Sequence, residues 1–127
     1  MASVMSDERQ KLGRWGEQLA AQRLGAQGYV MLDRNWRCRR GEIDLVAKEG
    51  DVLVFVEVKT RRGRDYGTPE EALTKYKAKR LLELGQHYLL EHNLEDVEWR
   101  VDLVAVELDR QGKLLRFEHI TNAVWAW

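Results

Sequence analysis

The chain has 127 residues, of which 44% are hydrophobic, 33% are charged and one is proline, as expected for a single globular domain rather than a disordered chain. Its 21 basic and 21 acidic residues leave no net charge, and no apolar run approaches the roughly 20 residues of a membrane span. Because the N-terminal segment is polar and the only cysteine, Cys38, has no partner for a disulfide, we expect a cytoplasmic protein with one domain over residues 1–127.

The first predicted element is a long amphipathic helix. Ser6 or Asp7 can cap its start, and Gly28 suits the position just beyond an end at about Gln27. The apolar residues of this segment recur at helical spacing, which predicts one buried stripe. This stripe consists of Leu12, Trp15, Leu19, Ala20 and Leu24.

Three strands should follow this helix. Runs rich in β-branched and aromatic residues predict strands over 29–37, 42–48 and 52–60, with a basic loop at 38–41 between the first two. The third run is apolar on both alternating sets of positions for most of its length. That pattern is typical of a central strand covered on both faces.

The second half of the chain predicts one helix and two more strands. The segment 68–71, Thr-Pro-Glu-Glu, has the features of a helix start, with its threonine as N-cap and its second glutamate completing a capping box. Apolar residues at helical spacing continue this helix to about His92, and strands are predicted over 99–108 and 114–120. The order α-β-β-β-α-β-β predicts an α/β domain with a mixed sheet flanked by helices.

The basic residues are concentrated although the net charge is zero. The windows 34–40, 59–64 and 75–80 contain 12 of the 21 basic residues and no acidic residue. Such segregation predicts one positive face for nucleic-acid phosphates, because a local field attracts a polyanion more than net charge does. The alternative is three separate solvated patches. The expected phosphate contacts are the loop arginines Arg37, Arg39, Arg40, Arg61 and Arg62.

The hairpin formed by the second and third strands brings two acidic residues together. If residues 50–51, Gly-Asp, form the two-residue turn that glycine favours, Asp44 lies opposite Glu57. Directly opposed side chains have Cβ atoms about 5 Å apart on one face. A four-residue turn would instead place Glu42 opposite Glu57. The hairpin therefore predicts a pair of carboxylates under either register.

This carboxylate pair predicts a metal site. Two carboxylates held so close repel each other unless a cation lies between them, and burying them unpaired among apolar neighbours would be costly. Asp44, Glu57 and the main-chain carbonyl of Val58 offer the oxygen ligands that Mg²⁺ prefers. Lys59 points to the same face, where its ammonium could orient the attacking water or neutralise charge on a phosphate. The alternative is a set of edge-strand charges that face water.

These residues carry a resemblance to a known group of nucleases. Asp44, followed after twelve residues by Glu57-Val58-Lys59, is similar to the motif of the PD-(D/E)XK superfamily, in particular its Holliday-junction-resolvase-like branch. Nearly the whole chain resembles the YraN-like family of uncharacterised small bacterial proteins. The matching segments are RN at 34–35, GEIDLVA at 41–47, FVEVKTR at 55–61 and HITNA at 119–123. Ile43 replaces the proline that gives the superfamily motif its name.

The resemblance implies a restriction-endonuclease-like αβββαβ core, with a central mixed sheet flanked by helices. It also implies dependence on Mg²⁺ or Mn²⁺ and cleavage of phosphodiester bonds. Asp44 and Glu57 would bind the metal, Lys59 would be the catalytic lysine, and Glu17 of the first helix would lie beside the metal. Helical geometry alone places Glu17 at the border of the apolar stripe, so a solvated charge is the alternative for this residue.

The sequence favours a metal-dependent endonuclease that acts on structured or branched DNA. The main alternative is a non-catalytic nucleic-acid-binding module with the same fold. A third possibility is a partner-binding protein that uses the aromatic C-terminus, where Trp125 and Trp127 could pack on the domain or form a homodimer. Trp36, inside the first basic window, could stack on a base or pack on neighbouring strands.

Overall fold

The computed structural model describes residues 4–124. The helices are α1 (Val4–Ala26), the short 3₁₀ helix η1 (Glu70–Ala72) and α2 (Lys75–Glu91). The strands are β1 (Val30–Cys38), β2 (Gly41–Glu49), β3 (Val52–Arg62), β4 (Trp99–Leu108) and β5 (Leu114–Val124). Trp125 and Trp127 lie outside the described residues, so their predicted packing stays a prediction.

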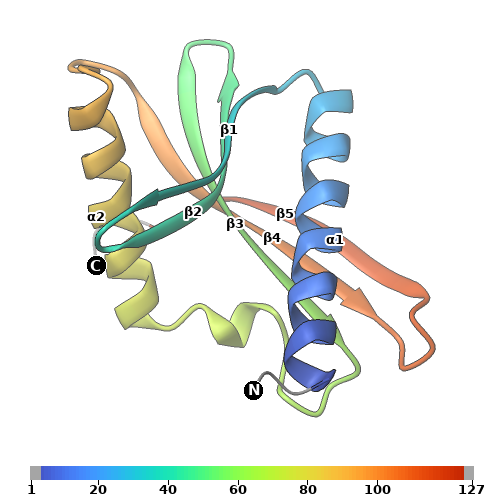
Figure 1. Ribbon diagram of the computed structural model, residues 1–127. Helices are drawn as coiled ribbons and strands as arrows, with labels where there is room; N and C mark the ends of the chain where they lie inside the picture. Colours follow the sequence, from blue (N-terminus) through green and yellow to red (C-terminus); the bar gives the residue numbers. More distant parts are fainter. Residues whose placement is uncertain (1–3, 125–127) are drawn as a thin grey trace.

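The five strands form one mixed sheet in the order β1-β2-β3-β4-β5. Neighbouring strands are antiparallel except β3 and β4, which run parallel and are joined through α2. A parallel pair needs such a long crossover, whereas β2 and β3 need only a tight turn. Figure 1 shows the twisted sheet between the two long helices. The α/β fold expected from the sequence is confirmed, and the arrangement is consistent with a restriction-endonuclease-like core.

Each long helix covers one face of the sheet, and β3 contributes to both cores. Val54, Val56 and Val58 pack in the core beneath α1, whereas Leu53 and Phe55 pack in the core beneath α2. This alternation follows from the two-residue period of a strand. The prediction that β3 is a central strand covered on both sides is therefore confirmed.

The buried face of α1 differs from the predicted stripe. The helix already begins at Val4, so Ser6 and Asp7 lie inside it instead of capping it. Trp15 is 41% exposed, which makes its prediction as a core residue wrong. The residues of α1 that are buried against the sheet are Gly16, Ala20, Ala21 and Leu24. Small residues on this face allow the helix to approach the sheet closely, and the Trp15 side chain is not part of this buried face.

The second helix begins later than predicted. The capping box at 68–71 does form, because the Thr68 amide donates to Glu71 Oε1 at 2.9 Å and the Glu71 amide donates to Thr68 Oγ1 at 3.3 Å. It starts only the single turn of η1. The long helix α2 starts at Lys75, where Thr74 Oγ1 accepts from the Lys77 amide at 3.2 Å. The chain thus uses two consecutive helix starts where the sequence predicts one.

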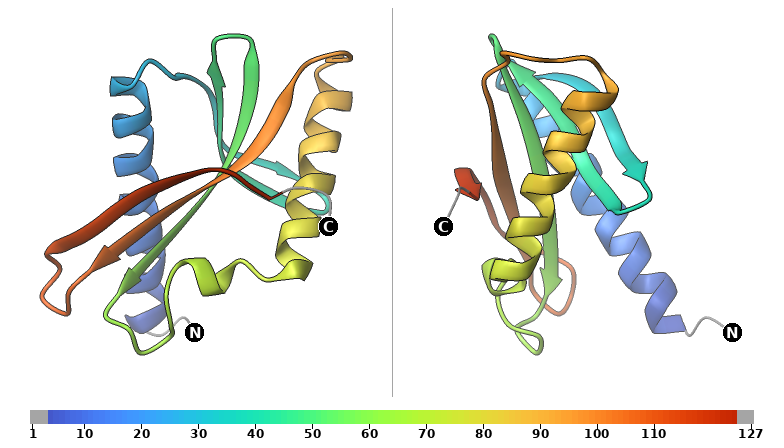
Figure 2. Two further views of the ribbon diagram at one scale, coloured as in Figure 1. Left: turned by 180° about the vertical axis from the view of Figure 1, so that it is seen from behind. Right: turned by 90° about the vertical axis from the view of Figure 1, so that its left-hand side faces the viewer.

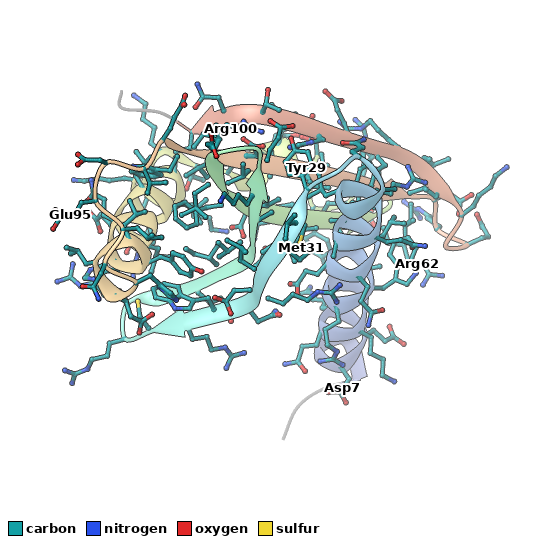
Figure 3. All side chains as sticks on the ribbon, turned by 90° about the horizontal axis from the view of Figure 1, so that it is seen from above. Asp7, Tyr29, Met31, Arg62, Glu95 and Arg100 are labelled. Atoms are coloured by element: carbon teal, nitrogen blue, oxygen red, sulfur yellow. The ribbon has the colours of Figure 1, made fainter. Side chains whose placement is uncertain are left out.

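A buried ionic cluster holds β4 against β5, away from the predicted metal ligands. Asp102 is fully buried and accepts hydrogen bonds from Arg100, from the His119 ring at 2.7 Å and from the Asn122 amide at 2.8 Å. Arg100 also donates to the Tyr29 hydroxyl at 2.9 Å, and both residues are labelled in Figure 3. Because every partner belongs to the fold, we assign this cluster a structural role.

Neither long helix, within the part of the chain that the structure describes, is long and apolar enough to span a membrane.

Candidate functional site

The register of the β2–β3 hairpin agrees with the prediction from the two-residue turn. Glu49 pairs with Val52 and Leu45 pairs with Val56. Asp44 and Glu57 are the next positions in this register, one step beyond the last ladder pair. The alternative register, with Glu42 opposite Glu57, is therefore wrong.

Strand β2 separates from β3 at Asp44. Asp44 Oδ2 accepts a hydrogen bond from the Val58 amide at 2.9 Å, where a main-chain carbonyl would stand in a continuous ladder. Ile43 and Val46 both pack in the core beneath α2 although they are three positions apart in the sequence. Because a regular strand would place them on opposite faces, β2 must rotate about its axis between these positions. The site lies at this fork of the sheet.

The fork brings Glu57 into direct interaction with Asp44. The side chain of Glu57 is 13% exposed. Its alternation with Val56 and Val58 places it on the face that α2 covers. Burial, followed by the hydrogen bond and the charge of Asp44, raises the pKa of Glu57 to about 9. Lys59 Nζ lies 3.8 Å from Glu57 Oε2 and lowers that pKa in part. The carboxylate pair and the lysine predicted from sequence are thus neighbours.

Glu17 of α1 reaches the same site from the opposite face. Burial and the nearby carboxylates of Asp44 and Glu42 raise the pKa of Glu17 to about 7. Asn35 Nδ2 donates to Glu17 Oε1 at 2.9 Å and opposes this rise. Glu17 is therefore a half-buried member of the cluster, and the alternative of a freely solvated charge does not hold.

Asn35 is a contributor that sequence reasoning did not identify. Its φ of 52° lies in the left-handed region, which asparagine adopts more readily than most residues. Its neighbours Arg34 and Trp36 pair with Leu45 and Ile43, so Asn35 lies beside Asp44 on the adjoining strand. The distorted backbone thus occurs where β2 rotates. An asparagine before Trp36 in an otherwise extended run is the weak signal that could have indicated it.

The sequence prediction also did not identify Gly16 as a contributor to the site. Gly16 determines how closely α1, and with it Glu17, approaches the sheet. A Cβ atom added at Gly16 would lie 1.9 Å from Thr60 Oγ1 on β3. Only glycine therefore allows this contact between α1 and β3. A glycine inside a predicted helix costs stability and often marks a packing contact, which is the signal in the sequence.

The functional side chains line one cavity of about 400 Å³ between α1 and the β2–β3 fork. It contains all four side chains that the sequence predicts to be catalytic, namely Glu17, Asp44, Glu57 and Lys59, together with Val58 and Glu42. In Figures 2 and 3 the start of α1 and the β1–β2 turn project to the same side of the molecule.

The donor set fits a hard divalent cation. The contact between Asp44 and Glu57 requires a shared proton, and a cation can take the place of that proton. The amide of Val58 points toward Asp44, so the Val58 carbonyl also faces the fork, because both groups of one residue point to the same side of a strand. Among the described residues, no three His, Cys, Asp or Glu side chains are arranged to hold a metal. Two carboxylates, one carbonyl and several waters are nevertheless a sufficient shell for Mg²⁺.

The five predicted phosphate-binding arginines lie in two groups, one at the β1–β2 turn and one at the end of β3, where Arg61 lines this cavity. Arg39 and Arg40 form the β1–β2 turn and are exposed, and the adjacent Arg37 pairs with Glu42 at 2.9 Å. Arg61 and Arg62 lie at the end of β3, and Arg62 Nε donates to the Arg110 carbonyl at 2.9 Å. Arg61 Nη1 donates to the Thr60 carbonyl at 3.2 Å, so three of the five guanidinium groups already have protein partners. The single continuous positive face stays a prediction.

Trp36 packs within the protein. The centre of its ring lies 5.3 Å from the centre of the Tyr88 ring, in an edge-on arrangement. Its Nε1 donates a hydrogen bond to Glu91 Oε2 at 2.7 Å. Of the two roles considered for this residue, packing on its neighbours is the one observed.

Known proteins similar to this chain share most of its length. Residues 16–106, which include Glu17, Asp44, Glu57 and Lys59, match the model of "Uncharacterised protein family UPF0102". A UPF0102 protein of Symbiobacterium thermophilum is 52% identical over 116 residues, covering 91% of this chain and 98% of its own length. The UPF0102 proteins of Roseiflexus castenholzii and Pelotomaculum thermopropionicum are 46% and 47% identical, each covering 94% of this chain and nearly all of their own length.

Proposed function

The chain belongs to the uncharacterised protein family UPF0102, and we propose that it is a divalent-metal-dependent nuclease that hydrolyses phosphodiester bonds in structured or branched DNA. The observation that carries this proposal is the gathering of Glu17, Asp44, Glu57 and Lys59 in one cavity at the β2–β3 fork. Buried acidic clusters with a raised pKa are uncommon outside functional sites. A lysine at the rim suits a substrate that bears negative charge.

Each side chain has a role that its position supports. Asp44 and Glu57, with the Val58 carbonyl, would hold Mg²⁺ or Mn²⁺. When bound, the metal would polarise the phosphate and favour ionisation of a coordinated water. The hydrogen bond from the Val58 amide holds the Asp44 carboxylate in place before any cation arrives. This preorganisation lowers the cost of assembling the site.

Lys59 and Glu17 would act on charge and protons beside the metal. The Lys59 ammonium, half-buried at the cavity wall, would neutralise charge that develops on the phosphate oxygens. Glu17 has a pKa of about 7 without metal, which suits a group that accepts or releases a proton near neutral pH. Asn35 would keep the Glu17 carboxylate turned toward the cavity through their hydrogen bond.

A cleavage screen tests the proposal. Linear, flapped and four-way-junction DNA would be incubated with the purified protein and Mg²⁺ or Mn²⁺, and products separated on denaturing gels. Glu57→Ala should abolish cleavage because it removes one of the two ligand carboxylates. Glu95→Ala, which changes an exposed glutamate in the loop before β4, should cleave like the wild type.

Two results would count against nuclease activity. If wild type and Glu57→Ala produced the same fragments, the activity would come from a contaminant. DNA binding without cleavage by any metal would favour the alternative, a non-catalytic nucleic-acid-binding module.

A further inference from the structure

A second cavity of about 360 Å³ adjoins the candidate site at the end of β3. The two cavities share one wall, made of Arg9, Leu12, Thr60 and Arg61. Glu8 of α1 and Tyr66 of the loop after β3 line only the second cavity. A ligand in either cavity would therefore lie directly beside a ligand in the other. The residues assigned to phosphodiester hydrolysis do not use this second space.

The lining combines groups that bind nucleobases. Tyr66 is 68% exposed, and the Arg9 guanidinium lies 5.1 Å from the centre of its ring. Unpaired bases stack on aromatic rings and on guanidinium planes. Leu12 adds apolar surface, and the Glu8 carboxylate offers an acceptor for an exocyclic amino group of a base.

Arg61 supplies an anion contact on the shared wall. Its Nε–H is buried and has no hydrogen-bond partner among the described residues, while its Nη1 donates to the Thr60 carbonyl at 3.2 Å. Buried donors without a partner are rare in folded proteins, because leaving them unpaired is costly. A phosphate oxygen at this wall would be a strong, charge-assisted acceptor.

The loop that presents Tyr66 is held in place by the β4–β5 hairpin. Arg64 Nε lies 2.9 Å from Glu107 Oε1, and Asp65 Oδ1 lies 3.0 Å from Arg110 Nη2. Arg62 Nε donates to the Arg110 carbonyl at 2.9 Å on the other side of this loop. Anchored loops lose little freedom on binding, so the cavity wall is preorganised for a ligand.

We propose that this cavity holds the unpaired nucleotide that adjoins the phosphate at the candidate site. The base lies against Tyr66 and Arg9, and its phosphate contacts Arg61. The cavity, of about 360 Å³, is at the lower end of the range of roughly 300–1,000 Å³ typical of small-ligand sites, a size that suits one nucleotide. This inference rests on the proposed function and deepens it, because the pocket would select junctions, flaps and single strands over continuous duplex. A duplex could use it only by unstacking a base.

Binding measurements without divalent metal test the pocket separately from cleavage. Fluorescence anisotropy in EDTA would compare the affinity of the full chain for a single-stranded oligonucleotide and for the blunt duplex of the same length. Tyr66→Ala should weaken single-strand binding about 5- to 100-fold, which is the range expected for one stacked base, and leave duplex binding unchanged. Quenching of a single 2-aminopurine base on binding would report stacking directly, and Tyr66→Ala should abolish it.

Tyr76 provides a matched control. It is also 68% exposed and has an arginine, Arg80, 5.4 Å from its ring centre, but it lies on α2 away from the second cavity. Tyr76→Ala should leave the ratio of single-strand to duplex affinity unchanged. If the ratio of single-strand to duplex affinity were the same for wild type and Tyr66→Ala, the proposed nucleotide pocket would be wrong, even if the protein cleaves DNA. If this affinity ratio fell in Tyr66→Ala and not in Tyr76→Ala, the result would support the nucleotide pocket, even if no cleavage were found.

Discussion

Glu57 is a glutamate whose ionisation the fold opposes. Its folded-state pKa of about 9 lies above the ordinary value of 4.5, so between these pH values the native state binds more protons than the unfolded chain. The stability that Glu57 contributes without metal is therefore fully present below about pH 4.5 and is lost as the pH rises through this window. Glu17 contributes a similar fall in stability, which ends near pH 7 because its pKa in the folded state is about 7.

Glu57→Gln should remove the Glu57 contribution to this fall over the whole range from about pH 4.5 to 9, so that only the smaller fall due to Glu17, which ends near pH 7, is left. Urea unfolding in EDTA at a series of pH values would measure it, with Glu95→Gln as the control that should follow the wild type. Parallel stability curves for wild type and Glu57→Gln would show that Glu57 is not protonated in the native state.

Lys59 distinguishes an enzyme from a binding module. Lys59→Ala should reduce cleavage by about 100-fold or more, because an ammonium that neutralises the phosphate is removed, while metal affinity changes little. Calorimetric titration with Mn²⁺ would measure the affinity, and a nicking assay would measure cleavage. Lys48→Ala, which changes an exposed lysine on β2, is the matched control. Unchanged cleavage in Lys59→Ala would remove this residue from the mechanism.

At the scale of secondary-structure elements, the contact between α1 and β3 holds Glu17 at the site. Gly16→Ala should destabilise the protein by about 1–3 kcal/mol, because the new methyl group would overlap Thr60 Oγ1 and push the helix away. Gly25→Ala in the same helix should instead stabilise the protein by about 0.5–1 kcal/mol, since a Cβ there meets no atom within 4 Å. Chemical denaturation measures both changes.

A second substitution identifies the cause of the Gly16→Ala effect. Adding Thr60→Ala should recover much of the lost stability and activity, because it removes the atom that the new methyl group meets. Purely additive effects of the two substitutions would mean that the clash is not responsible.

At the scale of the whole molecule, the distribution of charge matters more than the net charge of zero. The arginine groups at the β1–β2 turn and at the end of β3 suit a nucleic-acid strand that runs along the candidate site. The Nε groups of Arg37 and Arg62 already donate to protein acceptors, whereas the Nε of Arg61 has no partner among the described residues. Arg61 and the exposed Arg39 and Arg40 should therefore make the larger contributions.

DNA binding should therefore be strongly salt-dependent. Removing one side chain that binds a phosphate should flatten the slope of log affinity against log salt by about 0.9, so Arg39→Ala with Arg40→Ala should change it by nearly twice that amount. Fluorescence anisotropy over a range of NaCl concentrations gives the slope. Lys113→Ala, on the β4–β5 turn, is the control expected to leave it unchanged. An unaltered slope after replacement of all five predicted arginines would exclude them as phosphate ligands.

Local patterns in the sequence were sufficient to predict the hairpin and a pair of carboxylates on it, but not whether Asp44 or Glu42 lies opposite Glu57. The structure has the two-residue turn at 50–51, and the register of that turn brings Asp44 and Glu57 together. Strand alternation likewise predicts that β3 is covered on both faces. These features follow from neighbours in sequence, so sequence alone could determine them.

Contacts between distant segments decided the remainder. The sequence could not show that β2 rotates at Asp44, because the left-handed Asn35 and the packing of Ile43 beneath α2 occur only in the folded sheet. Whether Glu17 is solvated or joins the site depends on how closely α1 approaches Thr60, which Gly16 allows. The partners of Arg37 and Arg62, and the cavity beside Tyr66, also arise from chain segments that meet only through tertiary packing.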